Sequence, residues 1–281
     1  MIEFFQALAD PDLDFLRYAF FSGLAASAAF GIAGSYVVVR RISFIAGAIS
    51  HSVLAGIGLA LYLEHTHGIS WLNPLYGALM AALISAVVIG FTSLHLKQRE
   101  DTVIGAIWAV GMALGLLFIS QTPGYVDPMS YLFGNILMIS STEMWLIILL
   151  DLAIIGFTLI FYNNFMAICF DREFVLLRGI SANFYYIMLL CLIAVTVVLM
   201  VMIVGIVLVI ALLTLPAATA SLFSRSLKQM MVMAVVFCAL FTSVGLASSY
   251  SLDLPSGPVI IVLAGIVYAS ALIITRKIRK A

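Results

Sequence analysis

Long apolar runs fill most of this sequence, and a helix of about 20 apolar residues crosses the hydrocarbon core of a bilayer. Apolar residues make up 64% of the 281 residues, charged residues 9%, and the mean hydropathy is +1.22. A soluble domain instead carries roughly 25% charged residues. We therefore predict an all-α, polytopic integral membrane protein. Its runs are Phe20 to Val39, Ser43 to Leu63, Leu75 to Leu96, Val103 to Ile119, Ser141 to Tyr162, Asn183 to Met202, Gly205 to Ala220, Met230 to Tyr250 and Gly257 to Thr275.

The number of spans depends on the sixth and seventh runs, which touch at Ile203 to Ile206. A broken or re-entrant segment there gives eight transmembrane helices, and two separate spans give nine. The longest connection is Asn163 to Ala182, a predicted cytoplasmic loop. Because no connection is long enough for a second folded domain, we predict one transmembrane domain over residues 1–281.

The basic residues predict the orientation. Their clusters all follow odd-numbered runs, so an N-terminus outside the cell places 12 of the 13 Lys and Arg in the cytoplasm and leaves only Arg17 outside. Cytoplasmic loops of membrane proteins carry such an excess. We predict an outside N-terminus and a cytoplasmic C-terminus. The clusters are Arg40 and Arg41, Lys97 and Arg99, Arg172 and Arg178, Arg225 and Lys228, and the group Arg276, Lys277, Arg279 and Lys280.

The first 14 residues contain four acidic residues and no basic one, unlike the start of a secretory signal peptide. Ile2, Phe5 and Leu8 are spaced for a short interfacial helix that ends before Pro11. The net charge of zero gives no indication of a nucleic-acid partner, and none is expected. The sequence has no phosphate-binding GxxxxGK[ST] loop, HExxH motif or nucleophile elbow, so we predict a protein that is not itself an enzyme.

Two ionisable side chains lie near the middle of predicted spans, where an unpaired polar group is costly. His51 is in the second run and Asp151 in the fifth. Small residues flank His51 at helical spacing, so another helix can approach this face and the imidazole should point into the protein. His51 is either a structural histidine or a ligand for a transition metal. Asp151 is either held by a neighbouring donor or is a second ligand.

A second cluster, Glu64, His65 and His67, follows the second run at the predicted outer surface. Imidazole and carboxylate groups at such a mouth bind metal ions, although an aqueous loop also carries them without function. Pro216 interrupts the backbone hydrogen bonds of the seventh run and predicts a kink, either a hinge or a packing feature. We expect Thr214 and Thr219 to satisfy the freed backbone groups.

Four segments resemble, in order and spacing, the permeases of ABC-type zinc and manganese importers, the ABC-3 family. The likeness runs from about Leu16 to Ile274. The segments are ISHSVLAG at Ile49 to Gly56, FDREFVLLRGI at Phe170 to Ile180, LLTLPAATA at Leu212 to Ala220 and LDLPSGP at Leu252 to Pro258.

This resemblance implies a fold like that of the large, type II ABC importers. It implies a homodimer in the bacterial cytoplasmic (inner) membrane, two cytoplasmic ATPase subunits and an extracytoplasmic metal-binding protein. It also implies no permanently bound cofactor, Zn(II) or Mn(II) as cargo, and a coupling helix that contacts the ATPase. The residues that match this helix are Phe170, Asp171, Arg172, Glu173, Phe174 and Gly179.

The sequence departs from the family four positions before His51, where members often carry an acidic residue and this chain has Gly47. Asp151 is the only other carboxylate predicted at comparable depth. Mn(II) favours oxygen donors and zinc accepts imidazole readily, so the residues favour zinc, with manganese next. A secondary transporter and a permease for a metal chelate are the alternatives, and the former should show more buried acids than this chain has.

Overall fold

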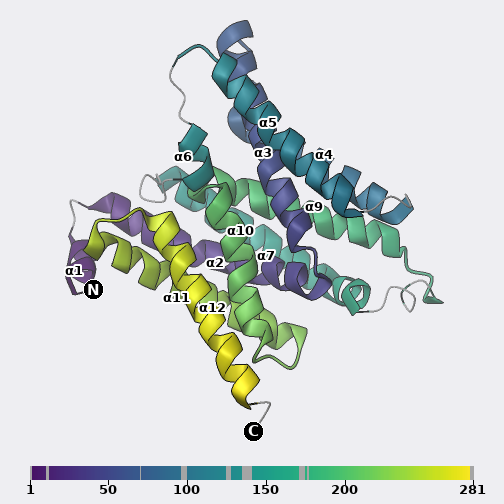
Figure 1. Ribbon diagram of the computed structural model, residues 1–281, viewed down its shortest axis with the longest axis vertical. Helices are drawn as coiled ribbons and strands as arrows, with labels where there is room; N and C mark the ends of the chain where they lie inside the picture. The colour runs from purple at the N-terminus through teal and green to yellow at the C-terminus, as the bar shows by residue number, and fades with distance from the viewer. Residues whose placement is uncertain are drawn as a thin grey trace. The chain divides into compact units, whose positions relative to one another are not determined.

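The computed structural model consists of helices throughout the residues it describes, which are 2–10, 13–69, 71–95, 100–124, 128–134, 141–170, 175 and 177–278 (Figure 1). This confirms the predicted all-α fold. The helices are α1 (Ile2–Ala9), α2 (Asp14–Arg40), α3 (Ser43–His67), α4 (Pro74–His95), α5 (Glu100–Gln121), α6 (Pro128–Phe133), α7 (Ser141–Phe170), α9 (Ala182–Val204), α10 (Ile206–Ser221), α11 (Leu227–Leu252) and α12 (Ser256–Ile278).

Within the described residues, eight helices are long and apolar enough to cross a membrane: α2, α3, α4, α5, α7, α9, α11 and α12. The shorter α10 is apolar as well. The break predicted between the sixth and seventh runs lies at Gly205, whose φ of 86° is in the region that favours glycine. Gly134, which follows α6 and also has a positive φ, lies directly against the backbone of Val204 and Gly205. Neither glycine can therefore take a side chain without strain or collision.

Several helices extend beyond the predicted runs: α2 begins at Asp14 and not at Phe20, and the largest difference is at the end of α7. The fifth run was expected to end at Tyr162, but α7 continues to Phe170. The first part of the predicted loop from Asn163 to Ala182 is therefore helical. Asn163 and Asn164 lowered the apolar signal of this stretch but do not end the helix.

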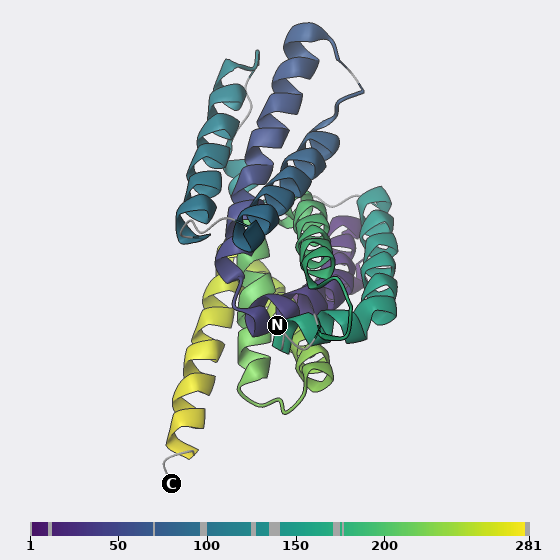
Figure 2. The same cartoon turned by 90° about the vertical axis from the view of Figure 1, so that its right-hand side faces the viewer.

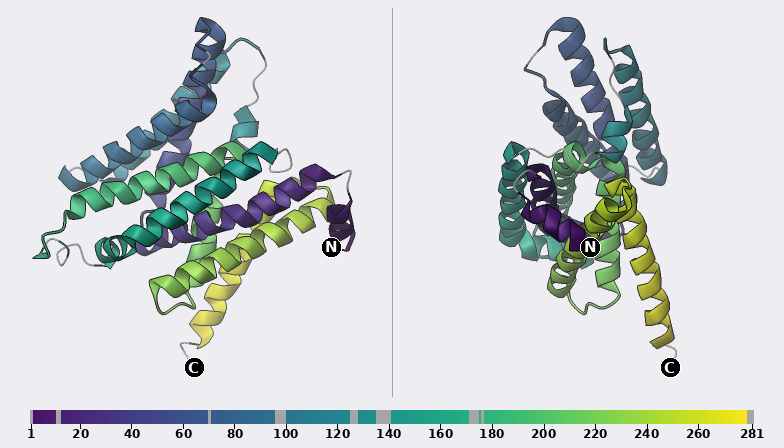
Figure 3. Two further views of the ribbon diagram at one scale, coloured as in Figure 1. Left: turned by 180° about the vertical axis from the view of Figure 1, so that it is seen from behind. Right: turned by 90° about the vertical axis from the view of Figure 1, so that its left-hand side faces the viewer.

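The chain divides into two compact units, which we describe separately. Unit 1 comprises residues 1–39, 133–160 and 203–281, and unit 2 comprises residues 40–132 and 161–202. In unit 1, α10, α11 and α12 pack on one another. There α2 lies beside α11, with Gly31 against Val235 (Figure 3). The short helix α1 packs through Phe4, whose ring meets those of Phe20 and Tyr250.

In unit 2, α3 packs against both α4 and α5 (Figure 2). It is the most enclosed of the candidate spans found in the described residues, with 83% of its most apolar window buried. Gly56 of α3 touches the backbone of Gly77 in α4. Gly58 touches the carbonyl of Gly115 in α5. The small residues around His51 thus allow close helix contact, as predicted.

Candidate functional site

His51 is half-buried in α3, and its imidazole lies against the indole of Trp108 from α5. The ring centroids are 4.6 Å apart and the planes differ by 20°, a stacked pair. The Nδ1 atom of His51 is buried and has no hydrogen-bond partner among the described residues. A buried nitrogen of this kind is costly unless something outside the chain pairs with it.

Gly47 makes room for this stack. It lies one turn before His51 on α3, and a Cβ atom at this position would be 2.8 Å from the Trp108 ring. The position four residues before His51 is therefore closed by an aromatic ring in this chain. The absence of a carboxylate at position 47 is visible in the sequence, but the filling of its place by Trp108 was not predicted.

Helices α3 and α5 are in backbone contact at one end, and at the other end the Trp108 side chain lies between them. Beyond His51, backbone approaches backbone: a Cβ at Gly111 would be 2.7 Å from the Cα of Ser52, and one at Gly58 would be 2.5 Å from the carbonyl oxygen of Gly115. Residue numbers rise together through these contacts, so α3 and α5 run in the same direction. The backbones of α3 and α5 are therefore closest beyond His51, and the indole of Trp108 lies between the two helices at Gly47.

Beside Trp108 the surface is hollowed by a cavity of about 380 Å³, which we call the α3–α5 cavity. Its lining residues are Phe44, Asp101, Ile104, Gly105 and Trp108. Asp101, Gly105 and Trp108 are spaced four and three residues apart, so they share one face of α5. The cavity thus extends along α5 from the ring on His51 to a carboxylate in the first turn of the helix.

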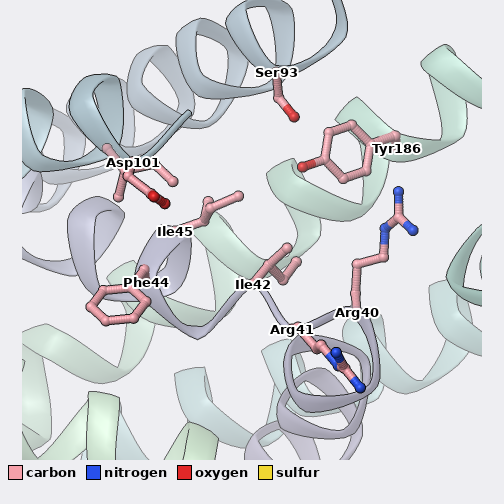
Figure 4. Close-up of a pocket in the computed structure, with 9 residues that line it drawn as sticks. Arg40, Arg41, Ile42, Phe44, Ile45, Ser93, Asp101 and Tyr186 are labelled. Carbon is pink, nitrogen blue, oxygen red and sulfur yellow. The ribbon is translucent and has the colours of Figure 1, made fainter. Parts of the chain in front are cut away.

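A second cavity of about 260 Å³, the polar vestibule, shares Phe44, Asp101 and Ile104 with the first. Figure 4 shows Arg40 extending toward Tyr186, whereas Arg41 turns the other way. The guanidinium carbon of Arg40 is 5.5 Å from the centre of the Tyr186 ring, a cation–π distance. The vestibule lies at the ends of α2, α4, α5 and α9 that carry predicted cytoplasmic charges. Its lining residues are Arg40, Arg41, Ile42, Phe44, Ile45, Ser93, Asp101, Ile104 and Tyr186.

Asp151 belongs to unit 1, whereas His51 belongs to unit 2. Its side chain is 4% exposed, and Oδ1 accepts a hydrogen bond of 3.2 Å from the backbone N–H of Ala29 in α2. The other oxygen, Oδ2, has no hydrogen-bond partner in the described part of the chain. Through Oδ1 the carboxylate of Asp151 therefore links α7 to α2, whereas Oδ2 makes no hydrogen bond with a described residue.

The outer cluster does not form a preassembled metal site. His65 Nδ1 lies 2.9 Å from the carbonyl oxygen of Leu61, which leaves Nε2 as the nitrogen that can bind a metal ion. His67 instead meets the ring of Tyr62 edge-on. Across the described residues, no three His, Cys, Asp or Glu side chains come together as a metal-binding group. The role of Glu64, His65 and His67 stays a prediction.

Only part of the predicted coupling segment can be placed. Asp171, Arg172, Glu173 and Phe174 lie outside the described residues. At its two sides Phe170 and Leu177 are strongly exposed, Leu177 at 87%. Gly179 has a φ of 71°, a conformation that suits the end of a short helix.

Pro216 is buried inside α10, which continues to Ser221. The expectation for the neighbouring threonines was wrong, because a proline frees the carbonyl four residues earlier, that of Leu212. Thr214 donates to the carbonyl of Ile210, and Thr219 donates to that of Leu215. The backbone of α2 at Gly34 lies directly against the Leu213 carbonyl, so this turn of α10 is tightly packed. Its role as a hinge stays a prediction.

These features define a multi-pass, all-helical membrane protein with polar side chains inside its spans, the class to which transport permeases belong. The chain belongs to the ABC 3 transport family, whose model matches residues 12–275. The family predicted from the four motifs is thus confirmed, and members of it are transport components and not enzymes.

The sequence is similar to two membrane proteins of bacterial metal transport. A probable metal transport system membrane protein of Chlamydia pneumoniae is 37% identical over 259 residues, which cover 92% of this chain and 88% of the relative. The manganese transport system membrane protein MntC of Listeria monocytogenes is 31% identical over 263 residues, covering 94% and 91%.

The fold is also similar to a solved structure, that of PsaBC from Streptococcus pneumoniae in complex with Fab. The TM-score is 0.85 and the sequence identity 30%, with 96% of this chain and 95% of the other covered. This likeness extends over nearly the whole molecule and agrees with the predicted permease fold.

Proposed function

We propose that this protein is the permease of an ATP-driven importer that moves a divalent transition metal across the bacterial cytoplasmic membrane, with the whole chain acting as one permease domain. The observation that carries the proposal is the His51 imidazole, which is at membrane depth with a buried nitrogen that pairs with nothing described in the chain. Neutral imidazole is a common transition-metal ligand. Membership of the ABC 3 family and the metal transport named for its relatives support it.

Manganese is the proposed cargo, and zinc is the alternative. The name of the Listeria relative supports manganese. The donor set by itself favours zinc, because α3 supplies an imidazole and no carboxylate at Gly47. Asp151, the oxygen ligand predicted from the sequence, is proposed to act in helix packing instead, because its Oδ1 already accepts from the Ala29 N–H.

A second copy of the chain is expected to complete the site. One chain offers no group of three metal-binding side chains among its described residues. A symmetric homodimer would bring two His51 side chains to a common axis, where two imidazoles and water can hold a metal ion weakly enough to release it.

Uptake of radioactive manganese and zinc in cells without other importers tests the site. His51→Ala should reduce uptake to the level of cells without the permease, because the proposed ligand is lost. Membrane abundance should not change, since Ala fits a helix well. Ser50→Ala is a matched control, because Ser50 is buried in the same turn and only donates to the Ala46 carbonyl. Normal uptake by His51→Ala at normal abundance would refute the assignment.

The ATPase is proposed to dock on the segment from Phe170 to Gly179. Exposed apolar side chains on both sides of the charged residues support this, since such groups mark interaction surfaces. Leu177→Asp should weaken copurification of the ATPase and abolish ATP-dependent uptake. Leu252→Asp is the control, because Leu252 is also an exposed leucine, at 64%, but lies at the opposite predicted surface. Equal loss of ATPase from both variants would disprove this docking site.

The outside N-terminus and cytoplasmic C-terminus are also proposed, on the strength of the basic clusters. Cysteines replacing Thr66, Ser221, Ser251 and Lys277 in a chain without its three native cysteines test the topology at the ends of α3, α10, α11 and α12. Positions 66 and 251 should react with an impermeant reagent from outside, and positions 221 and 277 only from inside. If Ser221→Cys reacts from outside, α10 does not cross the membrane.

A further inference from the structure

The proposed metal ligand is covered by a side chain that the function so far does not use. Trp108 stacks on His51 and at the same time lines the α3–α5 cavity. Its indole is therefore the group between the imidazole and this space. The cavity continues past Gly105 to Asp101, which also lines the polar vestibule.

We propose that Trp108 is a gate on the cytoplasmic side of His51. The inference rests on the proposed role of His51. In the arrangement seen here the indole covers the imidazole and closes the path toward Asp101. When the gate opens, the indole turns into the α3–α5 cavity, and the metal ion passes toward the Arg40, Arg41 and Asp101 end of unit 2.

The structure offers room for this motion on the side of Gly105. A side chain at Gly105, one turn before Trp108 on α5, would meet nothing within 4 Å. On the opposite side, toward α3, the ring already fills the space where a Cβ of residue 47 would be. The indole can therefore move along α5 into the cavity but cannot move closer to α3.

The contact that closes the gate can be broken without losing a hydrogen bond. His51 Nδ1 makes none with the described residues, and the two rings meet only face to face. A metal ion bound by Nδ1 would lie in the plane of the imidazole, at the edge of the stacked pair. Its way toward Asp101 passes the indole of Trp108, which lines the α3–α5 cavity.

The fluorescence of Trp108 reports the gate separately from transport. Trp71→Phe and Trp145→Phe replace the other two tryptophans, both exposed, and leave Trp108 as the single tryptophan of this chain; a complex that also carries Trp108→Phe gives the background emission of the ATPase. Manganese chloride added to the purified permease–ATPase complex in nanodiscs should quench this emission in a saturable way. His51→Ala should remove the saturable part. Absence of saturable quenching in the parent would refute the metal site itself.

Filling the cavity then tests the gate alone. Gly105→Leu should lower manganese uptake at least about tenfold, because the indole has no place to go, while saturable quenching through His51 persists. Gly265→Leu is the matched control in α12, where an added side chain also meets nothing within 4 Å. Equal uptake by the two variants would overturn the gate and leave the metal site standing. Gly105→Val and Gly265→Val give the same comparison if leucine lowers abundance.

Discussion

His51 and Asp151 are both rare polar side chains at membrane depth, yet the two units hold them differently. In unit 1 the carboxylate of Asp151 is enclosed, and its Oδ1 accepts from the backbone of α2 while its Oδ2 has no partner among the described residues. In unit 2 the imidazole of His51 is half-buried, bonds to no described residue through Nδ1, and lies under an aromatic ring beside a cavity. A bonded group stabilises helix packing, whereas an unbonded group next to open space is available to a ligand. Depth in the membrane alone does not distinguish the two.

The largest effect is expected from placing a carboxylate beside His51. Gly47→Asp forces the Trp108 ring to shift, because the new Cβ would be 2.8 Å from it. We expect the free energy of unfolding to fall by about 1–3 kcal/mol, as overpacking usually costs. Thermal unfolding in detergent would measure this loss.

In a Trp108→Ala background the clash is absent, so Gly47→Asp should cost less stability there than in the parent, and it leaves a carboxylate one turn from the imidazole. Manganese should then bind this double variant more tightly than it binds Trp108→Ala alone. A Gly47→Asp protein as stable as the parent would show that Trp108 is not confined by α3. The contrast between the two units would then lose its basis.

A smaller effect is expected from removing the charge of Asp151. Asp151→Asn keeps an oxygen that can accept from the Ala29 N–H, so uptake should stay within about twofold of the parent. Asp151→Ala loses that acceptor and should cost about 1 kcal/mol of stability, the usual contribution of one hydrogen bond. Loss of uptake by Asp151→Asn at normal abundance would instead assign this carboxylate to the metal path, and the two units would be alike.

The sequence predicted most of the fold because bilayer crossing leaves a strong one-dimensional signal. Apolar length found the spans, and the small residues around His51 correctly indicated a helix face in close contact. The end of α7 at Phe170 was missed because asparagines lower hydropathy without ending a helix. Gly205 was located as a possible break because two apolar runs met there with no polar loop between them.

The site was only half predictable. His51 could be found from its polarity, but Trp108 looks like any other aromatic residue in an apolar run. Its contact with Gly47 depends on how α3 and α5 pair, which no local pattern records. The glycine at position 47 was the one indication in the sequence, because a glycine on a contact face of a helix often faces a bulky side chain or the backbone of a neighbouring helix.

The length of α10 has a consequence for the lipid around the protein. Its 16 residues rise only about 24 Å, less than the roughly 30 Å of a typical hydrocarbon core. A transmembrane α10 therefore leaves one or both of its ends below the membrane surface. Where this is the Gly205 end, its non-helical backbone needs protein cover, which the contact with Gly134 supplies. Most of α10 is buried in protein, so the longer and more exposed spans α5, α7 and α12 determine which bilayer thickness fits the molecule.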